Sequence, residues 1–259
     1  MQGTDIAQVL GRRVLTFFAH VAGALALVLE AARSLPALAQ RPVRLVFFRQ
    51  IYFTGVQALF VVTAIGLVLG LAIITQVSSL AGRSTELTGR ILVWVVVREL
   101  GPLFAAIIVI ARSGTAVAAE LGSMKVSGEV RSLRAMGIPA ARYLVMPRIA
   151  GLTTSLLALL FFFQGVAVLG GLALASFLFE LPFRAQLDNL AGALSFFDLS
   201  ISLMKGLVFG LVIAAAACYH GLRVRTSITE VPQAAARAVI EALILVVVIN
   251  GFITVASFL

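Results

Sequence analysis

Long apolar runs without any charged residue divide this sequence. Residues 50–82, 149–179 and 242–259 contain no Asp, Glu, Lys or Arg. A transmembrane helix needs about 20 consecutive, predominantly apolar residues to cross a hydrocarbon core about 30 Å thick. The pattern therefore predicts membrane-spanning helices near 51–77, 149–178 and 238–258.

Two further apolar stretches are interrupted by a few charges. Residues 91–119 carry three charged side chains, and residues 200–220 carry only Lys205. Charged groups in a span usually face the bundle interior, a cavity or a partner. Lys205 lies about one turn inside its stretch, so we expect its ammonium to snorkel to the interface. With these two, the pattern predicts five spans and an all-α integral membrane fold.

The first 49 residues are less apolar and leave two interpretations. Arg12 and Arg13 before the apolar run 14–35 imitate a cleaved twin-arginine signal. Polar residues interrupt that run, however, and cations continue beyond it, which favours an amphipathic helix lying in the membrane interface. We therefore divide the chain into a cytoplasmic N-terminus with an interfacial helix, 1–49, and a five-span membrane domain, 50–259.

Composition and charge agree with a membrane protein. Hydrophobic residues make up 61% of the chain and charged residues 12%, whereas a soluble domain is about 25% charged. The net charge of +9 comes from cations gathered in 1–49, 120–148 and 221–237. Short cytoplasmic loops carry an excess of Lys and Arg. This distribution favours orientation in a membrane over nucleic-acid binding, and it predicts a cytoplasmic N-terminus and a C-terminus outside.

Catalytic and metal-binding patterns are missing from the sequence. Neither lysine follows the glycine pattern of a phosphate-binding loop. One cysteine and two distant histidines fall short of a zinc site, which needs about four ligands. We expect no catalytic residue, no metal and no cofactor in this chain, so that uphill transport would need a partner or an ion gradient.

The strongest intramembrane feature is the run Arg98-Glu99-Leu100-Gly101-Pro102. Adjacent residues diverge by about 100° on a helix, so Arg98 and Glu99 each need a partner of their own. Pro102 has no N–H, which leaves the Arg98 carbonyl without its helical donor and kinks the helix. This bent polar point is either a gate or cavity wall, or a structural clamp between helices.

A second feature is the predicted inner loop 120–148, between the second and third spans. It contains a short amphipathic helix that Gly137 ends, with Pro139 just beyond. Composition alone favours a solvated hairpin. The layout nevertheless resembles the coupling helix by which ABC permeases contact their ATPase subunits.

Several motifs together resemble the MlaE (YrbE-like) family of lipid ABC permeases. They run in order from about residue 50 to 240 and are Gln50-Ile51-Tyr52-Phe53-Thr54-Gly55-Val56, Arg98-Glu99-Leu100-Gly101-Pro102, Ala118-Ala119-Glu120-Leu121-Gly122-Ser123-Met124, Met136-Gly137, Tyr143-Leu144-Val145-Met146-Pro147-Arg148 and Lys205-Gly206-Leu207-Val208-Phe209-Gly210.

The resemblance implies a homodimeric permease of the bacterial inner membrane, with an interfacial elbow helix and five spans per copy. Such a permease works with two cytoplasmic ATPase subunits, which hold ATP and Mg, and with a periplasmic MCE-domain protein. It moves phospholipid between the inner membrane and the periplasm and so bears on outer-membrane lipid asymmetry. By the same resemblance, the residues at or near the ATPase contact are Glu120, Met124, Glu129, Arg134, Met136, Gly137 and Pro139, and those that line or brace the lipid cavity or gate are Arg98, Glu99, Pro102 and Asn250.

Two departures from the family pattern alter these expectations. A glycine-rich stretch is replaced by Thr226-Ser227-Ile228-Thr229-Glu230-Val231-Pro232, which makes this inner loop stiffer. An acidic residue in the last span is replaced by Asn250, which puts any charge pairing across helices to Arg98 or Lys205 in question.

Two other functions stay open from the sequence. An ion-coupled carrier would use Glu99 as a proton site, and a membrane anchor would use the polar run only for structure. Rows of small residues, such as Gly66 with Gly70 and Gly206 with Gly210, favour packing within one chain over a dimer seam.

Overall fold

The computed structural model describes residues 22–81, 85–179, 183–225 and 227–257, and almost all of these residues are helical. Among them, five helical stretches are long and apolar enough to cross a membrane. This confirms the all-α integral membrane fold with five spans. The five stretches are Arg41–Ser79, Gly89–Val126, Ala141–Leu178, Phe196–Arg223 and Glu230–Ala256.

Each observed span extends beyond the range that the apolar runs predict, at one end or at both ends. The reason is that the helix continues into the flanking polar residues. The first contains α2 (Arg41–Thr54), a short 3₁₀ turn and α3 (Leu59–Ala81). The helical segments that follow make up the other four spans and the helices that connect them. They are α4 (Thr85–Leu92), η3 (Val93–Leu100), α5 (Gly101–Val109), η4 (Ile110–Gly114), α6 (Thr115–Val126), α7 (Glu129–Ala135), η5 (Ala141–Val145), α8 (Met146–Gly165), η6 (Val166–Gly170), α9 (Gly171–Phe179), α10 (Phe183–Ala193), α11 (Phe196–Arg223) and α12 (Glu230–Ala256).

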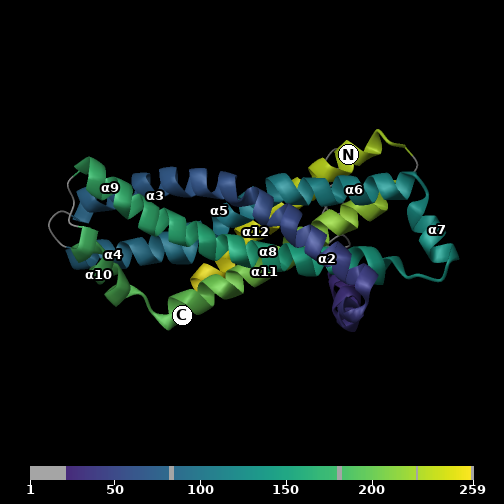
Figure 1. Ribbon diagram of the computed structural model, residues 1–259, viewed down its shortest axis with the longest axis horizontal. Helices are drawn as coiled ribbons and strands as arrows, with labels where there is room; N and C mark the ends of the chain where they lie inside the picture. Colours follow the sequence, from purple (N-terminus) through teal and green to yellow (C-terminus); the bar gives the residue numbers. More distant parts are fainter. Residues whose placement is uncertain (1–21, 82–84, 180–182, 226, 258–259) are drawn as a thin grey trace, which may run out of the picture.

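The spans run along the long axis of the molecule, with α11 packed against α6, α8 and α12 (Figure 1). The short helix α7 lies at one end of the bundle, and α4 pairs with α10 at the other. The connection between α11 and α12 lies at the α7 end. Two of the cation-rich segments of the sequence therefore share one end of the molecule.

Glycines allow the helices to approach closely. A Cβ atom on Gly70 of α3 would lie 2.0 Å from the Ala167 carbonyl oxygen, and one on Gly210 of α11 would lie 2.8 Å from Thr153 Cα. Neither approach is sterically allowed, so each position requires glycine. The packing of these glycines within one chain is thus confirmed.

A further helix, described over residues 22–33, precedes α2. It contacts α11, since a Cβ atom on Gly23 would lie 2.5 Å from the Tyr219 ring. In Figure 1 this dark purple segment does not follow the direction of the spans. The twin arginines and the first part of the predicted interfacial helix lie outside the described residues, and its position in the interface stays a prediction.

Candidate functional site

A wide turn in the second span opens its backbone at Pro102. The π-helical segment η3 ends where the Gly101 N–H donates to the Val96 carbonyl, one residue farther back than in an α-helix. Pro102 has no N–H to give to Arg98. The carbonyls of Val97 and Arg98 are therefore left for side-chain donors, as expected at such a π-turn.

Both carbonyls receive donors from other spans. Gln164 of α8 donates from Nε2 to the Val97 carbonyl at 2.9 Å, and Lys205 of α11 donates from Nζ to the Arg98 carbonyl at 2.8 Å. Gln164 also contacts the Ser202 hydroxyl at 2.7 Å. The π-turn before Pro102 thus serves as a junction between three spans.

The expectation that Lys205 snorkels to the interface was wrong. Its side chain is fully buried, and its ammonium forms an ion pair with Glu99 Oε2 at 2.9 Å. It donates in addition to Thr254 Oγ1 at 3.0 Å. With the Arg98 carbonyl, these acceptors match the three N–H groups of a lysine ammonium. Burial is tolerated because every donor has a partner.

Glu99 joins the last span to the second. Its carboxylate accepts hydrogen bonds from the Asn250 amide at 3.1 Å and from the Thr254 hydroxyl at 2.9 Å, besides the ion pair with Lys205. Asn250 therefore supplies a donor that a carboxylate could not supply at neutral pH. The absence of an acidic residue at position 250 does not prevent the pairing of Lys205, which takes Glu99 as its partner.

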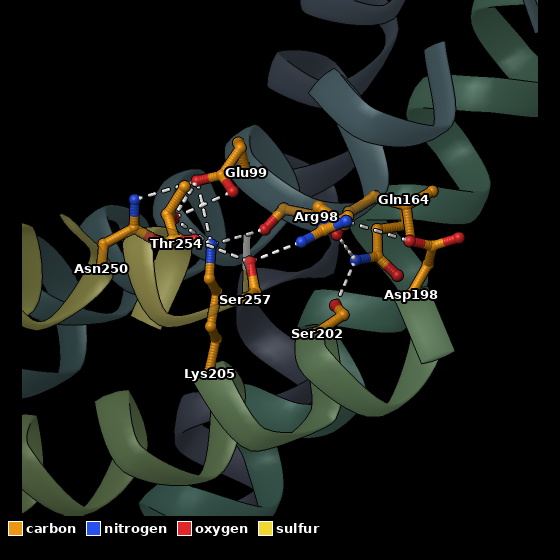
Figure 2. A network of polar contacts seen from close by, with 10 residues as sticks. Arg98, Glu99, Gln164, Asp198, Ser202, Lys205, Asn250, Thr254 and Ser257 are labelled. Carbon is orange, nitrogen blue, oxygen red and sulfur yellow. Dashed lines mark hydrogen bonds and ion pairs between the residues drawn. The ribbon is translucent and has the colours of Figure 1, made fainter. Parts of the chain in front are cut away.

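Arg98 points to a different set of partners, as its position next to Glu99 predicts. Its guanidinium donates to the Ser257 hydroxyl and lies 3.6 Å from Asp198 Oδ1. Figure 2 shows the two groups around Arg98 and Glu99, with side chains from four spans turned toward one another. We call the residues of this figure the polar junction. Its labelled members are Arg98, Glu99, Gln164, Asp198, Ser202, Lys205, Asn250, Thr254 and Ser257.

Sequence reasoning found only part of the polar junction. It named the members Arg98, Glu99 and Asn250 together with the neighbouring Pro102, and it placed Lys205 at the interface. It missed the other junction members on α8 and α11 and those at the end of α12. A signal was present, because Asp198, Ser202 and Lys205 follow one another at spacings of four and three. Asn250, Thr254 and Ser257 repeat that spacing, which places three polar residues on one face of an otherwise apolar helix.

The predicted coupling residues fall into two groups. Glu129, Arg134, Met136, Gly137 and Pro139 lie in or just after α7 at the end of the bundle, and all are exposed. Gly137 has φ of +74°. The Ile138 N–H donates to the Leu133 carbonyl across this glycine, so that the helix ends in the manner expected of a glycine stop.

The other group lies on α6, away from this exposed surface. Glu120 forms an ion pair with the buried Arg148 at 3.0 Å, and Met124 Sδ accepts from the same guanidinium at 3.8 Å. These contacts hold α6 against the start of α8. The structure therefore brings Glu120 and Met124 together around Arg148 and does not bring them to α7.

Arg112, the third charge of the second span, also has partners. It donates to the Phe53 carbonyl and to Gln57 Oε1, both at 2.8 Å. Its guanidinium lies 5.3 Å from the centre of the Phe53 ring. The residue thus ties the π-turn η4 to the first span.

Comparison with known proteins identifies the family of this chain. The sequence profile of the family described as Permease MlaE matches residues 47–256. The chain belongs to the MlaE permease family. It is accordingly a multi-pass membrane transport subunit, and the predicted family resemblance is confirmed.

Curated relatives extend the match to nearly the whole chain. A probable ABC transporter permease protein of Rickettsia typhi is 30% identical, and the alignment covers 96% of each chain. The intermembrane phospholipid transport system permease protein MlaE of Haemophilus influenzae is 25% identical, again with 96% of each chain covered. The chloroplastic protein TRIGALACTOSYLDIACYLGLYCEROL 1 of Arabidopsis thaliana is 30% identical over 60% of this chain and 45% of its own.

Proposed function

We propose that this chain is the membrane subunit of an ATP-driven phospholipid transporter in a bacterial inner membrane. It acts as a homodimer with two cytoplasmic ATPase subunits, which bind ATP and Mg, and it exchanges lipid with a periplasmic MCE-domain partner. The observation that carries the proposal is the end-to-end match to a permease named for intermembrane phospholipid transport.

The polar junction gives this function a mechanism. Lys205 and Arg98 present cationic groups beside the carboxylates of Glu99 and Asp198. A lipid phosphate offers the same kind of acceptor, with strong charge-assisted hydrogen bonds to Lys and Arg. We propose that the phosphate competes with these carboxylates, and that entry of lipid loosens the contacts between α5, α11 and α12.

The energy of ATP hydrolysis reaches this chain at the α7 end of the bundle, away from the polar junction. The exposed residues of α7 and the following turn, with Met136 and Ile138 as apolar contacts and Arg134 as a cation, form the proposed ATPase contact. Glu120 and Met124 act behind it by holding α6 to α8 through Arg148. ATP-driven movement of α7 is thereby transmitted along α6 to the π-turns of the second span.

The same arrangement supports a proposed orientation in the membrane. The connections that contain α7 and that join α11 to α12 share one end of the bundle and carry most of the loop arginines. By the excess of Lys and Arg in cytoplasmic loops, this end faces the cytoplasm, with the N-terminus inside and the C-terminus in the periplasm.

Reconstitution of the chain with an ABC ATPase and an MCE-domain protein of the same organism tests the proposal. Transfer of a fluorescent phospholipid should require ATP and should fall severalfold or more in Glu99→Gln. Glu30→Gln, the same change at an exposed carboxylate of the 22–33 helix, is the matched control and should leave transfer unchanged.

The same assay decides between the functions that the sequence left open. Transfer that stops with a protonophore and continues without ATP would replace the proposal by an ion-coupled carrier. Transfer unchanged in both Glu99→Gln and Arg98→Ala would reduce the polar junction to a structural clamp.

A further inference from the structure

A second polar site lies at the α7 end of the molecule, at the other ends of α11 and α12 from the polar junction. The end of α11, the start of α12 and their connection enclose a cavity of about 430 Å³. Three of the residues that line it are the arginines Arg223, Arg225 and Arg237, and Glu230 is the acidic one. The cavity is therefore strongly cationic.

The arginines are arranged so that they can receive an anion. The Arg223 guanidinium is held by the Tyr219 hydroxyl and lies 5.0 Å from the centre of that ring. Glu230 is engaged by the backbone N–H of Arg225 at 2.9 Å. Within the part of the chain that the structure describes, the guanidinium groups of Arg225 and Arg237 form no ion pair with this or another carboxylate.

An apolar pocket lies close to this cavity, on the membrane side. It has a volume of about 260 Å³ and is bounded by Leu25 and Val28 of the 22–33 helix, with Val212, Leu245 and Ile249 of α11 and α12. Its one charged lining residue is Glu241. The lining thus suits a hydrocarbon chain.

One buried pair lies between the two spaces. His220 lines the cationic cavity, Glu241 lines the apolar pocket, and His220 Nε2 is hydrogen-bonded to Glu241 Oε2. Both residues are more than nine-tenths buried, and among the residues that the structure describes the second oxygen of Glu241 accepts no hydrogen bond. A polar cavity and an apolar pocket on opposite sides of one residue pair are the pattern that an amphiphile requires.

We infer that this is a second lipid site, in which Arg223, Arg225 and Arg237 bind the phosphate of a phospholipid and the apolar pocket takes an acyl chain. Guanidinium groups bind phosphate through paired, charge-assisted hydrogen bonds. The site lies at the cytoplasmic end of the bundle, so it receives lipid of the inner leaflet. The substrate class in this inference rests on the proposed function. The inference adds the place at which lipid enters the transporter.

Photolabelling tests the site directly. The purified full-length chain is reconstituted in phosphatidylcholine vesicles that contain a phosphatidylglycerol with a photoreactive group on one acyl chain. Labelled residues are identified by mass spectrometry and should include Leu25, Val28 or Leu245. Labelling there should fall about tenfold or more in Arg225→Glu/Arg237→Glu, because charge-assisted contacts worth more than 1.4 kcal/mol are lost.

Three comparisons make the result decisive. Arg44→Glu reverses an exposed cation outside the cavity and should label like the parent chain. Arg225→Lys/Arg237→Lys should keep part of the labelling, which separates lost charge from lost folding. A photoreactive diacylglycerol without phosphate should label the pocket of the parent chain weakly; equal labelling by this probe, or undiminished labelling of the doubly reversed variant, overturns the inference.

Excess inorganic phosphate distinguishes a headgroup from a free anion. A lipid held at both ends should resist displacement, whereas loss of the label to inorganic phosphate would overturn the assignment to lipid. Phospholipid transfer by the complete complex is measured in parallel. Transfer without labelling here refutes this site alone, and labelling without ATP-dependent transfer refutes the proposed function alone.

Discussion

Lys205 illustrates the demand that a membrane interior places on a single residue. An unpaired charge in hydrocarbon is costly, and Lys205 is fully buried. It meets this cost with three acceptors, of which the Arg98 carbonyl is available only because Pro102 lacks an N–H. The lysine, the proline and Glu99 therefore form one unit, and a change at any of them affects the others.

Removal of this lysine should be costly. Lys205→Met keeps the length of the side chain but leaves Glu99 without its ion-pair partner and the Arg98 carbonyl without its side-chain donor. Loss of one partner of a buried pair destabilises by about 3–5 kcal/mol. Thermal unfolding in a fixed lipid composition measures the effect as a lower midpoint.

The other lysine of the chain is a matched control for this substitution. Lys125 donates to the Leu222 carbonyl from a partly exposed position, so Lys125→Met should cost only about 1 kcal/mol, the value of an ordinary hydrogen bond. Lys205→Met/Glu99→Gln should recover part of the loss. Equal midpoints for the two single lysine variants would contradict the pairing described for Lys205.

At the scale of helices, the sequence predicted which segments form helices better than it predicted which residues of different helices are in contact. Spans are visible as apolar runs because hydrophobicity is a local property, and Gly137 ends its helix by a local rule. Which residues meet across two helices depends on the rotation and the register of those helices. No local pattern in the sequence specifies either. The position of Lys205 was predicted wrongly for this reason. The helices α9, α10 and α4 continue past the end of α12 (Figure 1), so the start of the apolar run near residue 200 is not the edge of the bundle.

Close packing of α3 against the third span should depend on Gly70. Gly70→Ala would place a methyl group 2.0 Å from the Ala167 carbonyl oxygen, and the helices would have to move apart at a cost of about 1–3 kcal/mol. Gly165→Ala is the control, because its methyl group meets nothing within 4 Å. Gly165→Ala should raise the unfolding midpoint slightly, by the helix preference of about 0.5–1 kcal/mol. A midpoint unaffected by Gly70→Ala would refute the close approach.

Coupling through α7 should depend on its charge and on the turn that ends it. Arg134→Glu reverses an exposed cation on α7, and Gly137→Pro cannot adopt the φ of +74° found there. Both should lower lipid-stimulated ATP hydrolysis by the reconstituted complex severalfold without lowering the unfolding midpoint of the isolated chain. Arg184→Glu, an exposed change in α10 at the other end, should have no effect. Unchanged hydrolysis and assembly in both α7 variants would exclude a coupling role.

For the whole molecule, the distribution of charge predicts the orientation in the membrane. In the proposed orientation, the α7 end with its loop arginines faces the cytoplasm, and α4 with α10 forms the periplasmic end. Cys218 is the single cysteine and is buried, so single cysteines can be introduced into Cys218→Ala as markers. A membrane-impermeant maleimide should label Arg184→Cys in intact spheroplasts and Arg131→Cys only in inverted vesicles. The two positions lie on opposite sides of the third span, Ala141–Leu178. Labelling of both in intact spheroplasts would mean that this span does not cross the membrane, and it would also remove α7 from reach of a cytoplasmic ATPase.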